Sequence, residues 1–216
     1  MIILEVVVGS TVHGCSVSDG LDDLDLMAIE IEKPKQFVGF NVKDTWVERS
    51  KPVGVRSEAG DTDKVVYGLR KFLNLALKGN PTVLLAFFVP EEFIRWSDVR
   101  GRELQNLSPL IVSKQVFNPF RGYMRQQHER LLGLRGQRNV TRPELVAAHG
   151  YDTKYAGHIV RLGLQGEEIL LSGKITLPMP PAHRKLVTDV RRGKYTLAEV
   201  SEEIIKAENR INSAFN

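Results

Sequence analysis

The stretch VVVGSTVHG at residues 6–14, followed by LDDLDLMAI at residues 21–29, decides the fold of this chain. The apolar, largely β-branched run over 2–8 predicts a buried strand, and Gly9-Ser10 ends it. A second apolar run over 24–31 predicts another strand, which begins inside a cluster of three carboxylates. Because charged side chains are rarely placed where a buried strand begins, the cluster requires a chemical explanation.

A divalent cation would explain the acidic cluster. Asp23 and Asp25 are two residues apart, so both side chains point to the same face if the segment is a strand. Carboxylates that close resist joint ionisation unless a cation lies between them, and Mg²⁺ prefers such oxygen ligands together with substrate phosphates. Asp63 and Asp61 are candidates for a third carboxylate, because both precede an apolar strand segment. The simpler alternative is a solvated strand edge.

The Gly9-Ser10 pair lies between the first strand and a short helical segment. A helix N-terminus presents free backbone N–H groups to anions, glycine allows close approach of a phosphate, and serine adds a hydroxyl donor. The alternative is an ordinary turn. A phosphate at one strand end and Mg²⁺ ligands on the next strand is the arrangement that phosphoryl or nucleotidyl transfer requires.

The rest of the chain changes from strand periods to helical periods near residue 120. The segment 35–60 is expected to be irregular with a short strand near 53–57, and residues 91–117 are predicted to form a short helix followed by a strand over 105–117. Asp152 is predicted to cap a helix that ends near residue 172, and a Thr-x-x-Glu capping box at 196–199 begins another helix. We therefore predict an α/β (α+β) fold with a small mixed sheet followed by a mostly helical C-terminal part.

Composition limits the setting and the classes of site. The 216 residues carry a net charge of +4, divided between −3 over residues 1–113 and +7 over residues 114–216. That asymmetry fits a metal-binding part followed by a part that faces a polyanion, or it is chance drift along the chain. The single cysteine excludes an intrachain disulfide and a cysteine-based zinc site. The chain is expected to be cytoplasmic and without membrane association, because no apolar run has transmembrane length.

Gly9-Ser10 followed by Asp23-Leu24-Asp25 resembles the signature of the DNA polymerase β-like nucleotidyltransferase superfamily. The similarity is greatest to its small bacterial and phage members, and it spans most of residues 1–195. Two further motifs carry the resemblance, Tyr67-Gly68-Leu69-Arg70-Lys71-Phe72 and Gly79-Asn80-Pro81-Thr82. One departure is that members usually place Ser-Asp directly before Asp-x-Asp. Here three residues intervene after Ser18-Asp19, so that Asp22 could take the place of one ligand.

The resemblance implies a role for each of these residues. Gly9 and Ser10 would bind the nucleotide phosphates, and Asp23 and Asp25 would be catalytic ligands of Mg²⁺, with Mn²⁺ as an alternative ion. Asp63 would be the third catalytic carboxylate and metal ligand, acting as a base toward the acceptor hydroxyl, with Asp61 as its alternate. Residues 1–118 would form the nucleotidyltransferase catalytic core, and residues 119–216 a helical domain that closes over the nucleotide.

The implied reaction transfers a nucleoside monophosphate from an NTP to an acceptor hydroxyl. An RNA 3′ end, tRNA-like in form, is favoured as the acceptor, and a protein side chain is the next choice. The alternative is a non-catalytic nucleotide- or RNA-binding module, antitoxin-like or regulatory, that retains the same fold. Nothing in the sequence selects which NTP is used.

Two basic segments remain. Lys154, His158 and Arg161 match a later helix of the family and fall at i, i+4 and i+7, where they could bind a triphosphate. Residues 121–142 hold six arginines against one acid, and Arg130, Arg135 and Arg138 in that segment are candidates for binding a nucleic-acid backbone. For both segments the alternative is a solvated helix surface.

Overall fold

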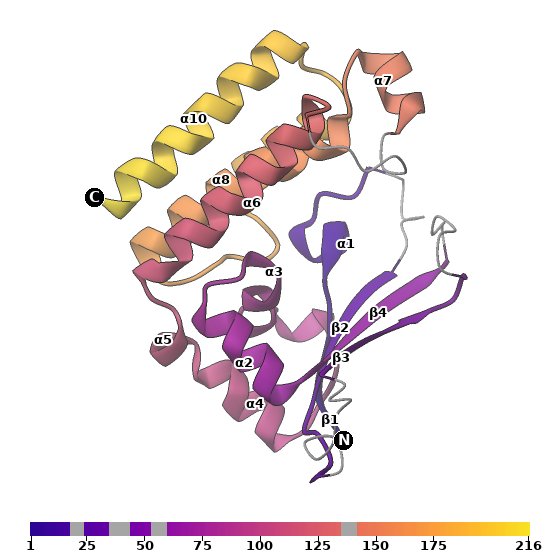
Figure 1. Ribbon diagram of the computed structural model, residues 1–216, viewed down its shortest axis with the longest axis vertical. Helices are drawn as coiled ribbons and strands as arrows, with labels where there is room; N and C mark the ends of the chain where they lie inside the picture. Colours follow the sequence, from indigo (N-terminus) through magenta and orange to yellow (C-terminus); the bar gives the residue numbers. More distant parts are fainter. Residues whose placement is uncertain (18–23, 35–43, 53–59, 135–141) are drawn as a thin grey trace. The chain divides into compact units, whose positions relative to one another are not determined.

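The computed structural model describes residues 1–17, 24–34, 44–52, 60–134 and 142–216 (Figure 1). The chain divides into two compact units, each described here by itself. Unit 1 comprises Met1–Val112 and Thr176–Pro178, and unit 2 comprises Ser113–Ile175 and Met179–Asn216. The sequence-based division between residues 118 and 119 falls inside the first long helix of unit 2. None of the helices in the described ranges is long and apolar enough to cross a membrane.

Unit 1 is built on a mixed sheet of five strands in the order β3-β4-β2-β1-β5. The strands are β1 (Ile2–Val7), β2 (Leu24–Glu30), β3 (Thr45–Arg49), β4 (Thr62–Gly68) and β5 (Ile94–Ser97). β2 and β4 are parallel, and the other neighbours are antiparallel. β1 and β2 are central and apolar on both faces, so that most of their side chains are buried, as the sequence predicts.

Short helices complete unit 1. They are α1 (Gly9–His13), α2 (Leu69–Leu77), α3 (Pro81–Leu84), η2 (Leu85–Phe87), η3 (Glu91–Phe93), α4 (Val99–Asn106) and α5 (Ser108–Ile111). Their apolar sides form the core, where the rings of Phe72 and Phe87 lie 5.3 Å apart between centroids. The backbone N–H of Leu69, at the start of α2, donates a 3.1 Å hydrogen bond to the buried carboxylate of Glu32. That bond satisfies one of the N–H groups that a helix start leaves free.

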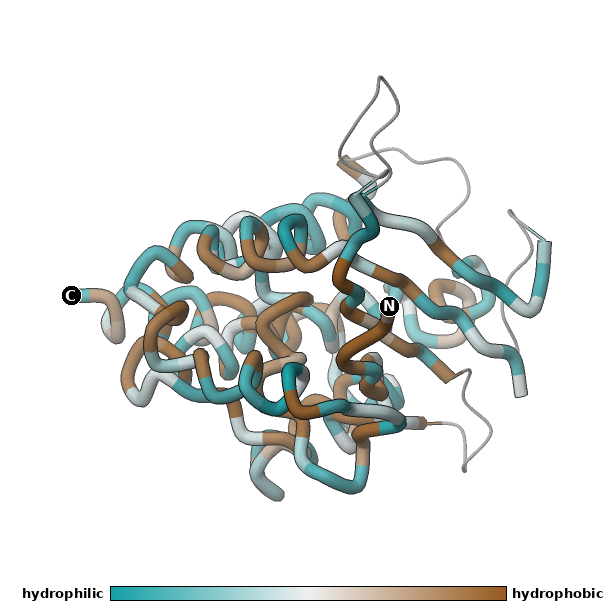
Figure 2. Tube along the Cα trace, turned by 90° about the horizontal axis from the view of Figure 1, so that it is seen from below, coloured by the Kyte–Doolittle hydropathy of each residue, from teal (hydrophilic) through white to brown (hydrophobic). Residues whose placement is uncertain are grey.

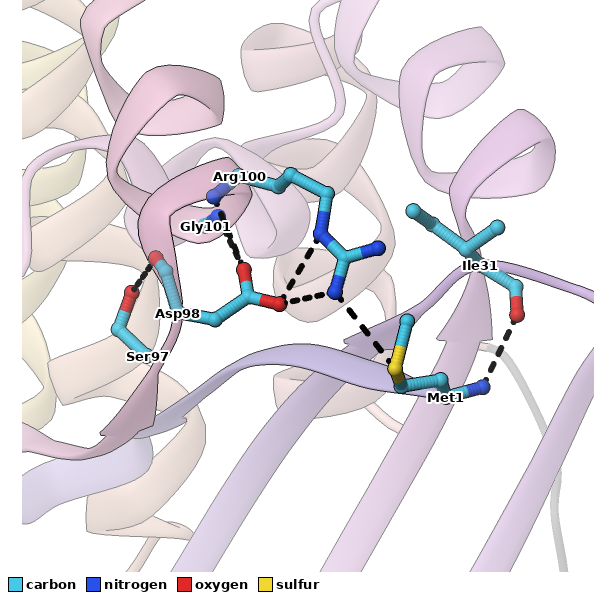
Figure 3. A network of polar contacts seen from close by, with 6 residues as sticks. All are labelled: Met1, Ile31, Ser97, Asp98, Arg100 and Gly101. Atoms are coloured by element: carbon cyan, nitrogen blue, oxygen red, sulfur yellow. Dashed lines mark hydrogen bonds and ion pairs between the residues drawn. The ribbon is translucent and has the colours of Figure 1, made fainter.

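The prediction of a strand over 105–117 is wrong, because local helix signals dominate there. Asp98 caps α4 by accepting hydrogen bonds from the backbone N–H groups of Arg100 and Gly101. Pro109 then lies in the first turn of α5, where its fixed φ favours a helix. Figure 3 shows the Asp98 carboxylate also bound by the Arg100 guanidinium, which reaches the Met1 sulfur at 3.5 Å.

Unit 2 is a bundle of helices around α8. Its helices are η4 (Lys114–Val116), α6 (Phe117–Leu131), α7 (Pro143–His149), α8 (Thr153–Ser172), α9 (Pro181–Arg191) and α10 (Leu197–Phe215). α8 packs against α6, α9 and α10, and its side chains are mostly buried. Along the helices, apolar residues alternate with polar ones (Figure 2), which is the pattern of helices with one buried side. The predicted α/β fold with a helical C-terminal part is confirmed.

The ends of the two longest helices of unit 2 follow from local sequence. Asp152 accepts hydrogen bonds from two backbone N–H groups at the start of α8, and Gly173, with φ of 70°, ends it. At the start of α10 the Thr196 hydroxyl accepts from the Glu199 N–H at 3.3 Å, and the Thr196 N–H donates to the Glu199 carboxylate at 2.7 Å. Both predictions of helix caps are confirmed.

Three glycines inside α8 allow its neighbours to approach closely. A Cβ on Gly157 would lie 2.4 Å from Cγ of Arg191 in α9, and a Cβ on Gly163 would lie 2.3 Å from Cβ of Ala207 in α10. A Cβ on Gly166 would meet Ile211 of α10 at 2.5 Å and Phe120 of α6 at 3.0 Å. Contacts that close leave room only for a hydrogen atom.

Asp189 joins α9 to the segment that follows it, and it makes the stability of unit 2 depend on pH. The ammonium groups of Lys185 and Lys194 lie 2.5 and 2.7 Å from its two carboxylate oxygens. Hydrogen bonds from both lysines lower the pKa of Asp189 from its ordinary value of 3.8 to about 2. A carboxylate whose pKa is lower in the folded state stabilises that state above the unfolded pKa and loses this contribution as the pH falls through the folded pKa.

Asp189→Asn is therefore expected to lower the melting temperature at neutral pH, because the amide cannot hold both ammonium groups by charge. The difference from the wild type is expected to shrink as the pH falls from about 4 to about 2. Thermal melts across that range measure it, with Glu208→Gln on the exposed side of α10 as the control. A difference between Asp189→Asn and the wild type that stays constant with pH would contradict the assignment.

Candidate active site

A tight turn between β1 and α1 brings the Gly-Ser pair to β2. Gly9 has φ of 71°, a left-handed conformation that strongly favours glycine, and Ser10 lies in the first turn of α1. The N–H of Val8 donates a 2.9 Å hydrogen bond to the carbonyl of Asp25, which fixes the turn to the neighbouring strand. Gly14, also left-handed with φ of 68°, ends the five-residue helix.

The carboxylate of Asp25 lies directly over Gly9. A Cβ on Gly9 would be 2.2 Å from Oδ2 of Asp25 and 3.0 Å from its Cγ, closer than any side chain allows. Glycine at this position therefore does two things, since it permits the left-handed turn and leaves the space that the carboxylate occupies. The sequence predicted that the Gly-Ser pair and the acidic strand belong to one site, and the structure brings Gly9 and Asp25 together.

Asp63 is the direct neighbour of Asp25 on the parallel strand. The two residues are paired in the register of β2 and β4, so that their side chains point to the same face of the sheet. Oδ1 of Asp63 is buried, and Nε of Arg49 on β3 lies 3.7 Å from it, at ion-pair distance. Two negative charges side by side repel each other, so the pair favours a cation between them.

Asp61, the alternate third acid, has a different environment. Its carboxylate oxygens accept a 3.0 Å hydrogen bond from the Ser50 hydroxyl and lie 3.0 Å from the Lys51 ammonium. These contacts join Asp61 to the segment after β3. Of the two candidates, Asp63 is the one that the register places beside Asp25.

The remaining predicted acids fall outside the described residues. Asp23, the other predicted ligand, and Asp22, its alternate, both precede the start of β2 at Leu24. Within the ranges that the structure describes, no group of three or more His, Cys, Asp or Glu side chains is placed to hold a metal ion. The described part of the predicted metal site is thus the pair of Asp25 and Asp63.

Lys154, His158 and Arg161, named here the α8 stripe, lie on one side of α8 in unit 2. Arg161 donates a 2.8 Å hydrogen bond to the Gln165 side chain. Desolvation and the charges of Arg161, Lys154, Arg191 and Arg142 lower the pKa of His158 well below its ordinary value of 6.5. The imidazole of His158 is therefore neutral at pH 7, because desolvation and the charges of these residues all disfavour its protonation.

The arginine-rich segment is described in part. Arg130 lies half-buried in the last turn of α6, whereas Arg135 and Arg138 lie outside the described residues. Two arginines that sequence reasoning missed belong to the sites described above. Arg49 lies at ion-pair distance from Asp63 and belongs to β3, a strand in the segment that was expected to be irregular. Arg191 of α9 is one of the charged residues that lower the pKa of His158. The apolar Trp46-Val47 pair was the signal for β3.

Comparison with known proteins supports the resemblance drawn from the motifs. Residues 1–209 match the family model RlaP, described as an RNA repair pathway DNA polymerase beta family. Among solved structures, a nucleotidyltransferase-like protein from Exiguobacterium sibiricum 255-15 matches with 10% identity and a TM-score of 0.34, over 99% of this chain and 68% of that chain. No curated protein matches. Because the family model covers all but the last residues, the chain belongs to the RlaP family, a DNA polymerase beta family.

Proposed function

We propose that this protein is a Mg²⁺-dependent nucleotidyltransferase that transfers a nucleoside monophosphate from an NTP to an acceptor hydroxyl. An RNA 3′ end is the favoured acceptor, and a protein side chain is the second choice. The observation that carries the proposal is the pairing of Asp25 with Asp63 on adjacent parallel strands, with the Asp25 carboxylate lying over Gly9. The pairing occurs in a chain of a DNA polymerase beta family.

The residues present fit a hard divalent cation. Carboxylate oxygens are the ligands that Mg²⁺ prefers, and the missing Cβ of Gly9 leaves the space that Oδ2 of Asp25 fills. Asp25 and Asp63 would hold the ion, with Asp23 as the further ligand that the resemblance implies. When bound, the ion would offset phosphate charge and make the acceptor hydroxyl easier to deprotonate.

The chain's own groups would do the rest of the work. The backbone of Gly9 and the hydroxyl of Ser10 would bind phosphate oxygens of the NTP. Asp63 would accept the proton of the acceptor hydroxyl as its oxygen attacks the α-phosphorus. The new bond joins the acceptor oxygen to that phosphorus, the bond to the β-phosphate oxygen breaks, and pyrophosphate leaves with the electron pair.

An RNA acceptor is favoured for two reasons. The description of the family names an RNA repair pathway, and residues 114–216 carry a net charge of +7. Arg121 and Arg125 are exposed on α6, from which a phosphate backbone could be contacted. Basic residues bind phosphates without reading bases, so this argument selects RNA as a class and no particular sequence.

The test supplies each of the four α-labelled NTPs with Mg²⁺, total RNA and lysate protein, with EDTA as the control. Label from one or more of the four NTPs is expected to appear in RNA, and the reactions that contain EDTA are expected to show none. Label in protein would move the acceptor to a side chain. Label in neither fraction, with nucleotide still bound, would support the non-catalytic module instead.

Lys154→Ala is expected to weaken NTP binding by roughly ten- to a hundredfold while changing RNA affinity much less. The reason is that a charge-assisted hydrogen bond to phosphate is worth about 1.5–3 kcal/mol. Titration of both ligands at two salt concentrations measures the effect, and Lys174→Ala, at an exposed lysine just beyond α8, is the matched control.

Removing the side chains of Arg130, Arg135 and Arg138 together is expected to have the opposite effect to Lys154→Ala. RNA binding is expected to weaken and its salt dependence to flatten, with NTP affinity retained. If Lys154→Ala binds NTP as the wild type does, the α8 stripe is a solvated helix face and takes no part in nucleotide binding.

A further inference from the structure

One side of α9 is basic and faces solvent. Successive residues of an α-helix are rotated by about 100°, which places four polar residues within about 100° of the helix circumference. They are named here the α9 arc and comprise Arg184, Lys185, Thr188 and Arg192, the last of which directly follows the helix. The buried Val187 and Val190 lie on the opposite side of the helix. The three cations of the arc are exposed, whereas Thr188 is half-buried.

Acids do not balance the charge of this part of the chain. Residues 181–196 hold five lysines and arginines against one acid, a balance of +4 that equals the net charge of the whole chain. The acid is Asp189, which the ammonium groups of Lys185 and Lys194 bind together at 2.5 and 2.7 Å. Within the part of the chain that the structure describes, the side chains of Arg184 and Arg192 make no hydrogen bond or ion pair.

Two other helices of unit 2 show the ordinary arrangement of exposed cations. Arg125 of α6 donates a 3.0 Å hydrogen bond to Glu129, and Lys206 of α10 donates one of 2.7 Å to Glu203. Such pairs one turn apart stabilise a solvated helix. Arg184 lies instead in the first turn of α9, which has no acid, although the helix dipole disfavours a cation there. The charges of the α9 arc therefore do not serve the stability of the helix.

The chemistry of the α9 arc fits a chain of phosphates. The arc has no aromatic or apolar side chain of the kind that anchors protein interfaces. The apolar side of α9 is buried, so the helix cannot insert that side into a lipid surface. Arginine binds two phosphate oxygens at once, and the threonine hydroxyl is a further donor. The backbone positions of Arg184 and Arg192 are about 12 Å apart along the helix, so the arc can follow successive phosphates.

We infer that the α9 arc binds the sugar–phosphate backbone of RNA. The contacts are made to phosphates and carry no base specificity. The inference rests on the proposed function in taking RNA as the nucleic acid, because the description of the family names an RNA repair pathway.

The test measures the binding of a fluorescein-labelled single-stranded RNA to the full chain, by anisotropy at several salt concentrations. The double variant Arg184→Ala, Arg192→Ala is expected to bind RNA about tenfold more weakly at low salt. The slope of log affinity against log salt is expected to become shallower by about 1.4, since each contact to a single strand contributes about 0.7. The corresponding double variant with lysine at both positions keeps the charges and is expected to keep the slope.

A matched control removes the same charge elsewhere. Lys78→Ala with Lys174→Ala, at two exposed lysines, is expected to change the slope little. Because all of these positions are exposed, each variant is expected to melt close to the wild-type temperature. The inference is overturned if the wild type does not bind the RNA, or if the double alanine variant of the arc binds it no more weakly than this control. Unchanged RNA binding with a loss of binding to phosphatidylserine vesicles would assign the arc to a membrane surface instead.

The two proposals fail in distinguishable ways when the same variants are assayed for nucleotide transfer. A chain that binds RNA through the α9 arc but transfers no labelled nucleotide would retain this surface and lose the proposed enzyme activity. A chain that transfers nucleotide to RNA, with the double alanine variant unchanged in RNA binding, would keep the enzyme activity and lose this surface.

Discussion

Asp25→Asn is expected to abolish nucleotidyl transfer, by at least about a hundredfold, while leaving unit 1 folded. The substitution keeps the shape that lies over Gly9 but removes one of the charges that would hold Mg²⁺. Because Asp25 and Asp63 are neighbours in register, loss of one charge also relieves repulsion in the metal-free protein. The melting temperature is therefore expected to hold or rise slightly, and transfer assays with thermal melts measure both results.

Two matched variants show whether the right acids have been chosen. Asp63→Asn is expected to be as inactive as Asp25→Asn, whereas Asp61→Asn is expected to retain transfer, because its carboxylate contacts Ser50 and Lys51. An inactive Asp61→Asn with an active Asp63→Asn would reverse that assignment. Full activity of Asp25→Asn would mean that other carboxylates bind the ion, and Asp22 would then be tested beside Asp23.

Among residues whose side chains take no part in the reaction, Gly9 is the one whose substitution by alanine is expected to reduce transfer most. The added methyl group would lie 2.2 Å from Oδ2 of Asp25, so the carboxylate must move, and transfer is expected to fall by roughly a hundredfold. Because alanine is strained in the left-handed conformation, the substitution is also expected to lower the free energy of unfolding by about 1–2 kcal/mol. Denaturant unfolding and transfer assays on the same preparation measure the two effects.

Gly60→Ala separates those two effects. Gly60 has a comparable φ of 86°, but no atom of the residues that the structure describes lies within 4 Å of the position of its Cβ. Gly60→Ala is therefore expected to show the backbone cost with transfer unchanged. If Gly9→Ala lost no more activity than Gly60→Ala, the close contact between Gly9 and Asp25 would have no part in the reaction.

The parts of the fold that local chemistry determines could be predicted from the sequence. The apolar run before Gly9 and the apolar run after Asp25 each specify a strand, since both faces of the two strands are buried. The ends of α8 and α10 were predicted because a cap forms between residues close in sequence, as in the box of Thr196 and Glu199. The membership of the DNA polymerase β-like superfamily followed from the same short motifs.

The parts that depend on distant packing could not be predicted. The apolar residues of 105–117 suit a strand or a buried helix equally, and the cap at Asp98 and the proline in the first turn of α5 decide in favour of helices. β3 was missed because it is an edge strand with charged, exposed residues. The contact of Arg191 with Gly157 joins residues 34 positions apart, so only the packing of α9 on α8 reveals it.

The close contacts at the glycines of α8 also limit how this protein could be engineered for heat resistance. Replacing helical glycine by alanine is a standard stabilising substitution, since it reduces the conformational freedom of the unfolded chain. At Gly163 and Gly166 the new methyl group would instead push α10 away, because Ala207 and Ile211 already occupy that space. Thermostabilising libraries should therefore leave the glycines of α8 unchanged and vary its few exposed positions, such as Leu171.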